Sequence, residues 1–260
     1  MEKFNIKNRK GLRIVGEIHK PVNSVGLAFT VHGLGAFKEH PSIMTAVNIL
    51  LENNFNVVNF DTTNSLGESE GKYEDATMQQ HYNDLVDVIN WSKTQEWYSE
   101  PFTLAGSSFG GYAVLRYAED YPQNVKGVFS KAGVVSGKLS FERSKKFNTE
   151  KYLNWQNTGW YEEESFSKPG VIKRLPWSHI EERLNHDLLP KVSKLTMPIL
   201  IIVGDQDISH LEDQRTLFDV LPENSNNQLH IMKDAPHTFR EEKHLNEMKD
   251  ILDNWLKKIK

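Results

Sequence analysis

The chain has 260 residues, of which 38% are hydrophobic and 25% are charged, and its formal net charge at pH 7 is -4. This composition is typical of a globular protein with a full hydrophobic core, not of a disordered chain. A dedicated nucleic-acid-binding protein carries a basic excess, which this sequence lacks. Because it has no cysteine, disulfides, thiolate metal sites and a cysteine nucleophile are excluded.

Targeting and cofactor motifs are also missing from the sequence. Residues 1–4 lack the basic-then-apolar pattern of a signal peptide. The apolar run at 199–203 is far too short to cross a bilayer. The sequence has no phosphate-binding glycine loop, dinucleotide fingerprint or cluster of metal ligands. We therefore expect a cytoplasmic protein without an integral membrane segment, cofactor or metal. The oligomeric state stays open, with a homodimer as one alternative.

Short apolar runs alternate with amphipathic segments along the chain. Strands are predicted at 4–8, 12–19, 25–31, 56–60, 102–105, 125–130, 198–203 and 228–232, the first two forming a hairpin. Helices are predicted at 43–53, 82–91, 110–118 and 245–259. Strands that alternate with helices form βαβ units. We therefore expect one α/β domain over residues 1–260, built on a mostly parallel eight-stranded sheet flanked by helices.

The alternation lapses between about residues 136 and 190. This segment is rich in aromatic residues and in charges of both signs, and it is predicted to be an insertion between two core strands. Trp155 and Trp160 are candidates for an aromatic wall that contacts substrate. The alternative is that these rings only pack the insertion onto the core.

Residues 106–110, Gly-Ser-Ser-Phe-Gly, match the pattern G-x-S-x-G with Ser108 at its centre. They directly follow the strand predicted at 102–105 and open the helix predicted at 110–118. At so tight a strand-to-helix turn the small neighbours relieve crowding, and the serine hydroxyl stands clear of the sheet edge. This context predicts Ser108 as a nucleophile. A glycine-rich turn without chemistry is the alternative.

A serine hydroxyl is a weak nucleophile until a base takes its proton. His237 follows the last predicted strand, on a loop at the carboxyl edge of the sheet, where active sites of open α/β folds gather. His230 lies inside that strand and His244 in or before the final helix, so both are poorer candidates. We predict His237 as the base, with a surface loop histidine as the alternative.

The carboxylate that orients the imidazole is expected in residues 204–207, Gly-Asp-Gln-Asp, after the strand at 198–203. Asp207 is favoured on the expected loop geometry, and Asp205 is the competitor. The resulting chain order of serine, aspartate and histidine differs from that of the two best-known serine protease folds.

An acyl-transfer transition state also needs donors for its developing oxyanion. The backbone N–H of Phe109, directly after Ser108, is one candidate. Leu34, in the His-Gly-Leu-Gly loop at 32–35, supplies the other, because the glycines let the backbone approach a substrate closely.

Several motifs together are typical of one superfamily. They are His32-Gly33-Leu34-Gly35 with Lys38-Glu39, Phe60-Asp61 with residues 67–71, residues 106–111, residues 204–207 and Pro236-His237. With them the chain resembles the α/β-hydrolases of the group that contains monoacylglycerol lipases, cinnamoyl and feruloyl esterases and serine aminopeptidases. The resemblance implies an α/β-hydrolase fold in which residues 136–190 form a cap over the active site.

These residues predict a serine hydrolase that cleaves small-molecule carboxylic esters through an acyl-enzyme intermediate, with Ser108, Asp207 and His237 as its triad. Thioesters and small amides or peptides need the same apparatus, so a thioesterase or peptidase is the near alternative. A ligand-binding member of the fold without activity is the alternative from another class.

Overall fold

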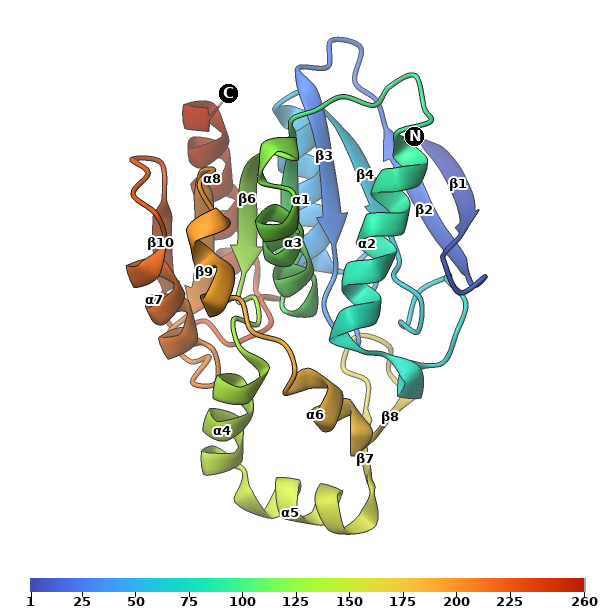
Figure 1. Cartoon of the computed structure of the whole chain (residues 1–260), viewed down its shortest axis with the longest axis vertical. Coiled ribbons are helices and arrows are strands. Elements are labelled where there is room, and N and C mark those ends of the chain that lie inside the picture. Colours follow the sequence, from blue (N-terminus) through green and yellow to red (C-terminus); the bar gives the residue numbers. More distant parts are fainter. Residues whose placement is uncertain (260) are drawn as a thin grey trace.

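A central eight-stranded sheet organises the protein, for which a computed structural model describes residues 1–259 (Figure 1). The strand order is β1-β2-β4-β3-β5-β6-β9-β10. The strands are β1 (Glu2–Lys7), β2 (Arg13–His19), β3 (Gly26–Val31), β4 (Phe55–Phe60), β5 (Phe102–Ser107), β6 (Val125–Lys131), β9 (Ile199–Gly204) and β10 (Gln228–Met232). β2 is antiparallel to β1 and β4, and the other neighbours are parallel. The predicted mostly parallel sheet is confirmed.

Helices cover both faces of the sheet. One face packs against α1 (Pro41–Glu52) and α8 (Glu242–Ile259). The other packs against α2 (Met78–Ser92), α3 (Phe109–Asp120) and α7 (Leu211–Val220). Every residue of β5 and β9 is buried, as expected for parallel strands covered on both sides.

Local signals explain where the core helices begin and end. α2 begins four residues before the predicted start, because the Thr77 hydroxyl accepts a hydrogen bond from the Gln80 N–H. α1 has a proline in its first turn, where the missing N–H leaves no hydrogen bond unmade. α7 was not predicted. Within residues 1–259, no helix is both long and apolar enough to cross a membrane.

The segment between β6 and β9 forms a separate layer beyond the carboxyl ends of the strands (Figure 1). It contains α4 (Gly137–Phe147), α5 (Thr149–Thr158), the hairpin β7 (Trp160–Glu164) with β8 (Ile172–Pro176), and α6 (Ser178–Arg183). Single-turn 3-10 helices elsewhere are η1 (Tyr73–Asp75) and η2 (Pro122–Asn124), and the longer η3 (Leu189–Lys194) leads back to β9. Ser136 and Asp187 pair in an isolated bridge, so the chain leaves the core and returns to it at one place. We call residues 136–190 the cap segment.

The start of α3 lies unusually close to the sheet. A Cβ atom at Gly110 would collide with the carbonyl oxygen of Val31, at the end of β3. A Cβ atom at Gly106 would collide with the backbone of Gly110. Both glycines of the G-x-S-x-G pattern are therefore required for packing, whatever chemistry the serine performs.

Gly110→Ala should lower the free energy of unfolding by about 1–3 kcal/mol or more. The added methyl group would collide with the backbone oxygens of Val31 and His32, which cannot move away. Chemical denaturation measures this change. Gly26→Ala is the matched control, since its Cβ would meet only the edge of the Phe55 ring, at 3.3 Å, and its effect should be smaller. Equal effects of the two substitutions would contradict this account of the turn.

Candidate active site

Ser108 lies at the turn between β5 and α3 in a strained backbone conformation. Its φ is 55° and its ψ is -114°, a combination that L-residues rarely adopt. The conformation is held by hydrogen bonds at both ends of the residue. Its N–H donates to the carbonyl oxygen of Lys131 at 2.9 Å, and its carbonyl oxygen accepts from the N–H of Tyr112 at 3.0 Å. A strained residue that its surroundings hold in place is a feature of functional sites.

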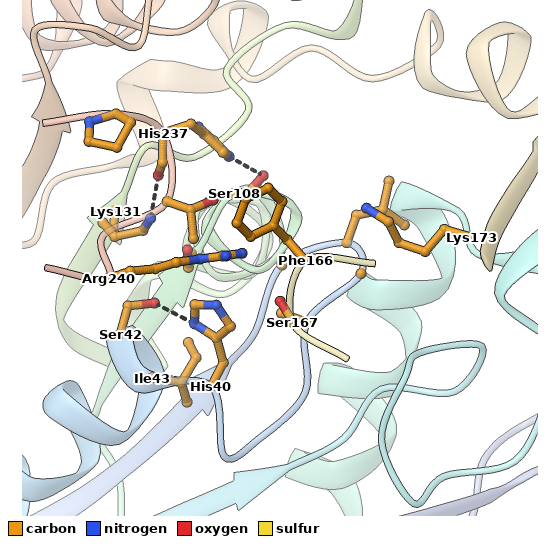
Figure 2. Close-up of a pocket in the computed structure, with 17 residues that line it drawn as sticks. His40, Ser42, Ile43, Ser108, Lys131, Phe166, Ser167, Lys173, His237 and Arg240 are labelled. Atoms are coloured by element: carbon orange, nitrogen blue, oxygen red, sulfur yellow. Dashed lines mark hydrogen bonds between the residues drawn. The ribbon is translucent and has the colours of Figure 1, made fainter. Parts of the chain in front are cut away.

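The structure brings together the three residues that the sequence predicts as a triad. His237 Nε2 lies 3.2 Å from Ser108 Oγ (Figure 2), and His237 Nδ1 lies 2.5 Å from Asp207 Oδ2. Asp207 is buried directly after β9. Asp205 is exposed, and within residues 1–259 its side chain forms no hydrogen bond or ion pair with the imidazole. The geometry thus favours Asp207 over its competitor.

A second imidazole, which the sequence did not predict, shares Asp207. His210 Nδ1 lies 2.9 Å from Asp207 Oδ1, and its ring stacks on that of His237 with centroids 4.6 Å apart. Burial opposes ionisation of Asp207, but the charge of His237 and hydrogen bonds from both imidazoles outweigh it and hold the pKa of this carboxyl well below its usual range. The only sequence signal for His210 is its position three residues after Asp207.

Asp207, His210 and His237 are also the group among the described residues that resembles a metal-binding site. One nitrogen or oxygen atom from each lies within 4.8 Å of the others. The geometry is that of hydrogen bonds. Each carboxylate oxygen of Asp207 already faces one ring nitrogen, at 2.9 and 2.5 Å. A zinc ion needs about 2.0–2.2 Å to each ligand and would not fit between such pairs.

The two N–H groups expected to bind an oxyanion are free of protein partners. Within residues 1–259, neither the Leu34 N–H nor the Phe109 N–H donates a hydrogen bond. Phe109 is the first residue of α3, so its N–H lies at the helix N-terminus, where the helix dipole favours negative charge. Gly33 packs closely against Ser107 and Ser108, since an added Cβ would lie 3.0 Å from atoms of each. This contact brings the loop with Leu34 to Ser108.

Ser108 and His237 open into a cavity of about 430 Å³ between the core and the cap segment (Figure 2). Leu34 and Ile43 supply apolar walls, and Phe166 reaches in from the cap segment. Lys131, at the end of β6, donates a hydrogen bond to the carbonyl oxygen of His237 at 2.7 Å and so ties the histidine loop to the sheet.

The proposed aromatic wall of Trp155 and Trp160 is not at this cavity. Trp155 is buried inside the cap segment, where it packs with Tyr152 and its neighbours. The Arg174 guanidinium packs over the Trp160 ring, 3.8 Å from its centroid. Neither tryptophan is among the residues that line the cavity. Trp155 has the packing role that the sequence left as the alternative, because its cluster also packs against Leu34 and Tyr73, which lie outside the cap segment. Phe166 is the aromatic residue of this segment at the cavity.

The fold and its comparisons with known proteins define the class. The sheet order with helices on both faces is that of the α/β-hydrolase fold, and the chain is a member of this superfamily. Residues 41–260 match the prolyl oligopeptidase family, to which the chain therefore belongs.

Similar proteins fit this assignment. Mitochondrial palmitoyl-protein thioesterase ABHD10 of Mus musculus is 25% identical over 150 residues, or 58% of this chain and 48% of the mouse protein. The chain thus spans about half the length of this curated relative. The solved structure of mouse alpha/beta hydrolase domain-containing protein 10 has a TM-score of 0.78 at 19% identity, over 100% of both chains. Est1E from Butyrivibrio proteoclasticus with bound ferulic acid has a TM-score of 0.76 at 18% identity, over 98% of both. At these identities the two structures show the shared fold alone.

The geometry distinguishes the two aspartates by experiment. Asp207→Asn should lower kcat for a reaction in which His237 takes up a proton by about 10³–10⁴-fold, because an amide would not stabilise the resulting imidazolium. Asp205→Asn is the matched control and should change kcat less than about twofold. Steady-state kinetics of the two variants provide the measurement, and the reverse ranking would assign the carboxylate to Asp205.

Buried neutral histidines near the site should make the protein sensitive to acid. Burial lowers the pKa of His81 to about 3 and that of His179 to about 4, and burial with the positive charges of Lys131 and Arg240 lowers the pKa of His40 to about 4. An unfolded imidazole takes up its proton near pH 6.5. The unfolded state therefore binds more protons below that pH, and folded-state stability should fall as the pH drops from about 6.5 towards 4.

His40→Gln should reduce the stability loss between about pH 7 and pH 5 by about 1–2 kcal/mol, because one buried imidazole is removed. Denaturant unfolding at each pH gives the free energies. His19→Gln is the control, since His19 is partly exposed at the end of β2. A pH dependence in His40→Gln identical to that of the unsubstituted protein would show that His40 titrates normally.

Proposed function

We propose that the protein is a serine hydrolase that cleaves carboxylic esters through an acyl-enzyme intermediate. The observation that carries this proposal is the continuous line of contacts from Ser108 Oγ through His237 to Asp207, at 3.2 and 2.5 Å. The strained backbone of Ser108 and its place at the mouth of a cavity support the same role.

The residues act in two half-reactions. His237 takes the proton of the Ser108 hydroxyl as its oxygen attacks the acyl carbon, and then returns that proton to the leaving alcohol. Water, deprotonated by the same imidazole, then attacks the acyl-enzyme, and His237 returns the proton to Ser108 Oγ as the bond to the acyl carbon breaks and the acid leaves. Asp207 orients His237 and stabilises its cation, while the free N–H groups of Leu34 and Phe109 bind the oxyanion of each tetrahedral intermediate.

His210 has a supporting role in this mechanism. Because it donates to the second carboxylate oxygen, it fixes the plane of Asp207 and so the direction of the hydrogen bond to His237. Lys131 holds the backbone of the loop that carries His237, because its ammonium group donates a hydrogen bond to the carbonyl oxygen of His237. The imidazole is thus held both at its ring and at its backbone.

A thioesterase is the second candidate, because the mouse relative is named a palmitoyl-protein thioesterase. The family name makes a peptidase the third. Esters, thioesters and amides of the same acyl group separate these candidates directly. An esterase should show the highest kcat/KM on the oxygen ester, whereas a thioesterase should prefer the thioester, and a peptidase should cleave a peptide amide that the other two leave intact.

Ser108→Ala should lower kcat for p-nitrophenyl butyrate by about 10³-fold or more, because no other group supplies the nucleophile. Ser107→Ala is the matched control, since Ser107 lines the same cavity but is the last residue of β5, directly before the turn. The two variants are compared by steady-state kinetics after their melting temperatures are shown to match. Turnover by Ser108→Ala close to that of the unsubstituted protein would contradict the proposal.

A further inference from the structure

The cavity beside Ser108 is basic although the chain as a whole is acidic. Among the 17 described residues that line it, three are lysine or arginine and none is aspartate or glutamate. The net charge of the chain is -4. A cavity that concentrates one sign of charge against the charge of the whole molecule attracts ligands of the opposite sign.

Two of these three cations lack an anionic partner. Lys173, on the cap segment, pairs with Glu163 at 2.5 Å and is neutralised. Lys131 and Arg240 form no ion pair within residues 1–259. The positive charge available to a ligand therefore comes from Lys131 and Arg240.

Lys131 is a buried ammonium group with unused donors. Only 3% of its surface is exposed, and within residues 1–259 its ammonium group makes a single hydrogen bond, to the carbonyl oxygen of His237. An ammonium group has three N–H donors, and the Phe239 ring lies 4.6 Å from this one, so at least one donor remains for a ligand. Burial lowers the pKa of Lys131 to about 8, and the charge of Asp207 opposes the shift, so the group is mostly charged at neutral pH. The charge of Asp207 acts on Lys131 without forming an ion pair with it within the described residues, so an anion in the cavity would stabilise the ammonium group further.

Arg240 also lines the cavity, from the loop that carries His237. It lies three residues after His237, and its guanidinium packs at 4.3 Å over the ring of Phe166 from the cap segment. It makes no hydrogen bond within the described residues. In Figure 2 its side chain extends across the cavity, with the guanidinium between Ser108 and His40 in this view. Its fork of donors matches the two oxygens of a carboxylate.

His40 lines the same cavity as both cations. The positive charges of Lys131 and Arg240 add to burial in lowering the pKa of His40. The neutral His40 and the hydroxyl of Ser42, which lie 3.1 Å apart at the cavity wall, provide further polar contacts without adding negative charge. Leu34, Ile43 and Phe166 make the rest of the wall apolar, which suits an organic anion better than an inorganic one.

We propose that Lys131 and Arg240 form a carboxylate-binding subsite, and that the substrates of this hydrolase are esters with a free carboxylate. The proposal rests on the hydrolase function proposed above and specifies its substrate class. The carboxylate belongs either to the acyl part, as in a half-ester of a dicarboxylic acid, or to the leaving group. Both share the same chemistry at the subsite.

Matched ester pairs test the proposal. Mono-p-nitrophenyl glutarate and p-nitrophenyl valerate have acyl chains of similar length and differ in the acyl carboxylate. Acetoxybenzoate and its methyl ester differ in a carboxylate on the leaving group. We expect kcat/KM for one of the two anionic esters to exceed that of its neutral partner by about tenfold or more, the value of one charge-assisted hydrogen-bonded pair. High salt should reduce this ratio, because it screens the cations.

Variants of Arg240 identify the subsite. Arg240→Gln should lower the anionic-to-neutral ratio about tenfold, and Arg240→Glu should bring it below one, because the new carboxylate repels the substrate. Arg215→Gln is the matched control, since Arg215 is exposed on α7, lies outside the cavity and should leave the ratio unchanged. Arg240 is exposed, so these substitutions should not unfold the protein. An unchanged ratio in both Arg240 variants, or no preference for either anionic ester, would overturn the proposal.

A binding experiment separates this inference from the proposed function. Isothermal titration of glutarate and benzoate into the Ser108→Ala protein measures the subsite without any turnover. Binding of either acid that is lost in the double variant Ser108→Ala/Arg240→Gln supports the subsite even if no ester is cleaved. Neutral esters cleaved without an anionic preference would leave the hydrolase function intact and reject the subsite. Failure to bind either acid, with no ester cleaved, would reject both.

Discussion

The approach of α3 to the edge of the sheet constrains the whole site. Gly106 and Gly110 leave no room for a side chain, because backbone atoms of α3 and β3 occupy that space. The chain can enter the helix so abruptly only if Ser108 takes a positive φ, and the hydrogen bonds to Lys131 and Tyr112 hold it there. The same packing leaves the Phe109 N–H free at the start of the helix and places the hydroxyl at the cavity.

The charges then divide the site into two parts: one stabilises a positive charge on an imidazole, and the other attracts a negatively charged ligand. On one side, Asp207 is a buried carboxylate stabilised by two imidazoles, which suits a histidine that gains and loses a proton. On the other side, Lys131 and Arg240 present positive charge to a cavity whose described lining residues include no aspartate or glutamate. Lys131 connects the two parts, because it holds the backbone of His237 and faces the cavity at once.

The sequence predicts the features that local residue patterns determine, namely the strands and the turn at Ser108. It does not predict which side chains face the cavity, because that depends on how distant segments pack. The eight strands follow from apolar runs, and the elbow at Ser108 follows from its glycines and its position between a strand and a helix. Aromatic content alone gives no direction, so Trp155, which faces the core of the cap segment, could not be distinguished from Phe166, which faces the cavity. Lys131 ends an apolar strand, and only its packing against the histidine loop reveals its place in the site.

The central claim is that the Ser108 hydroxyl becomes acylated during turnover. Intact-protein mass spectrometry during reaction with a slowly deacylated ester or a fluorophosphonate, followed by peptide mapping, tests it most directly. The account predicts a single adduct on the peptide that contains Ser108, formed in the unsubstituted protein and absent from Ser108→Ala. An adduct on another residue, or steady ester hydrolysis without any adduct at Ser108, would contradict it.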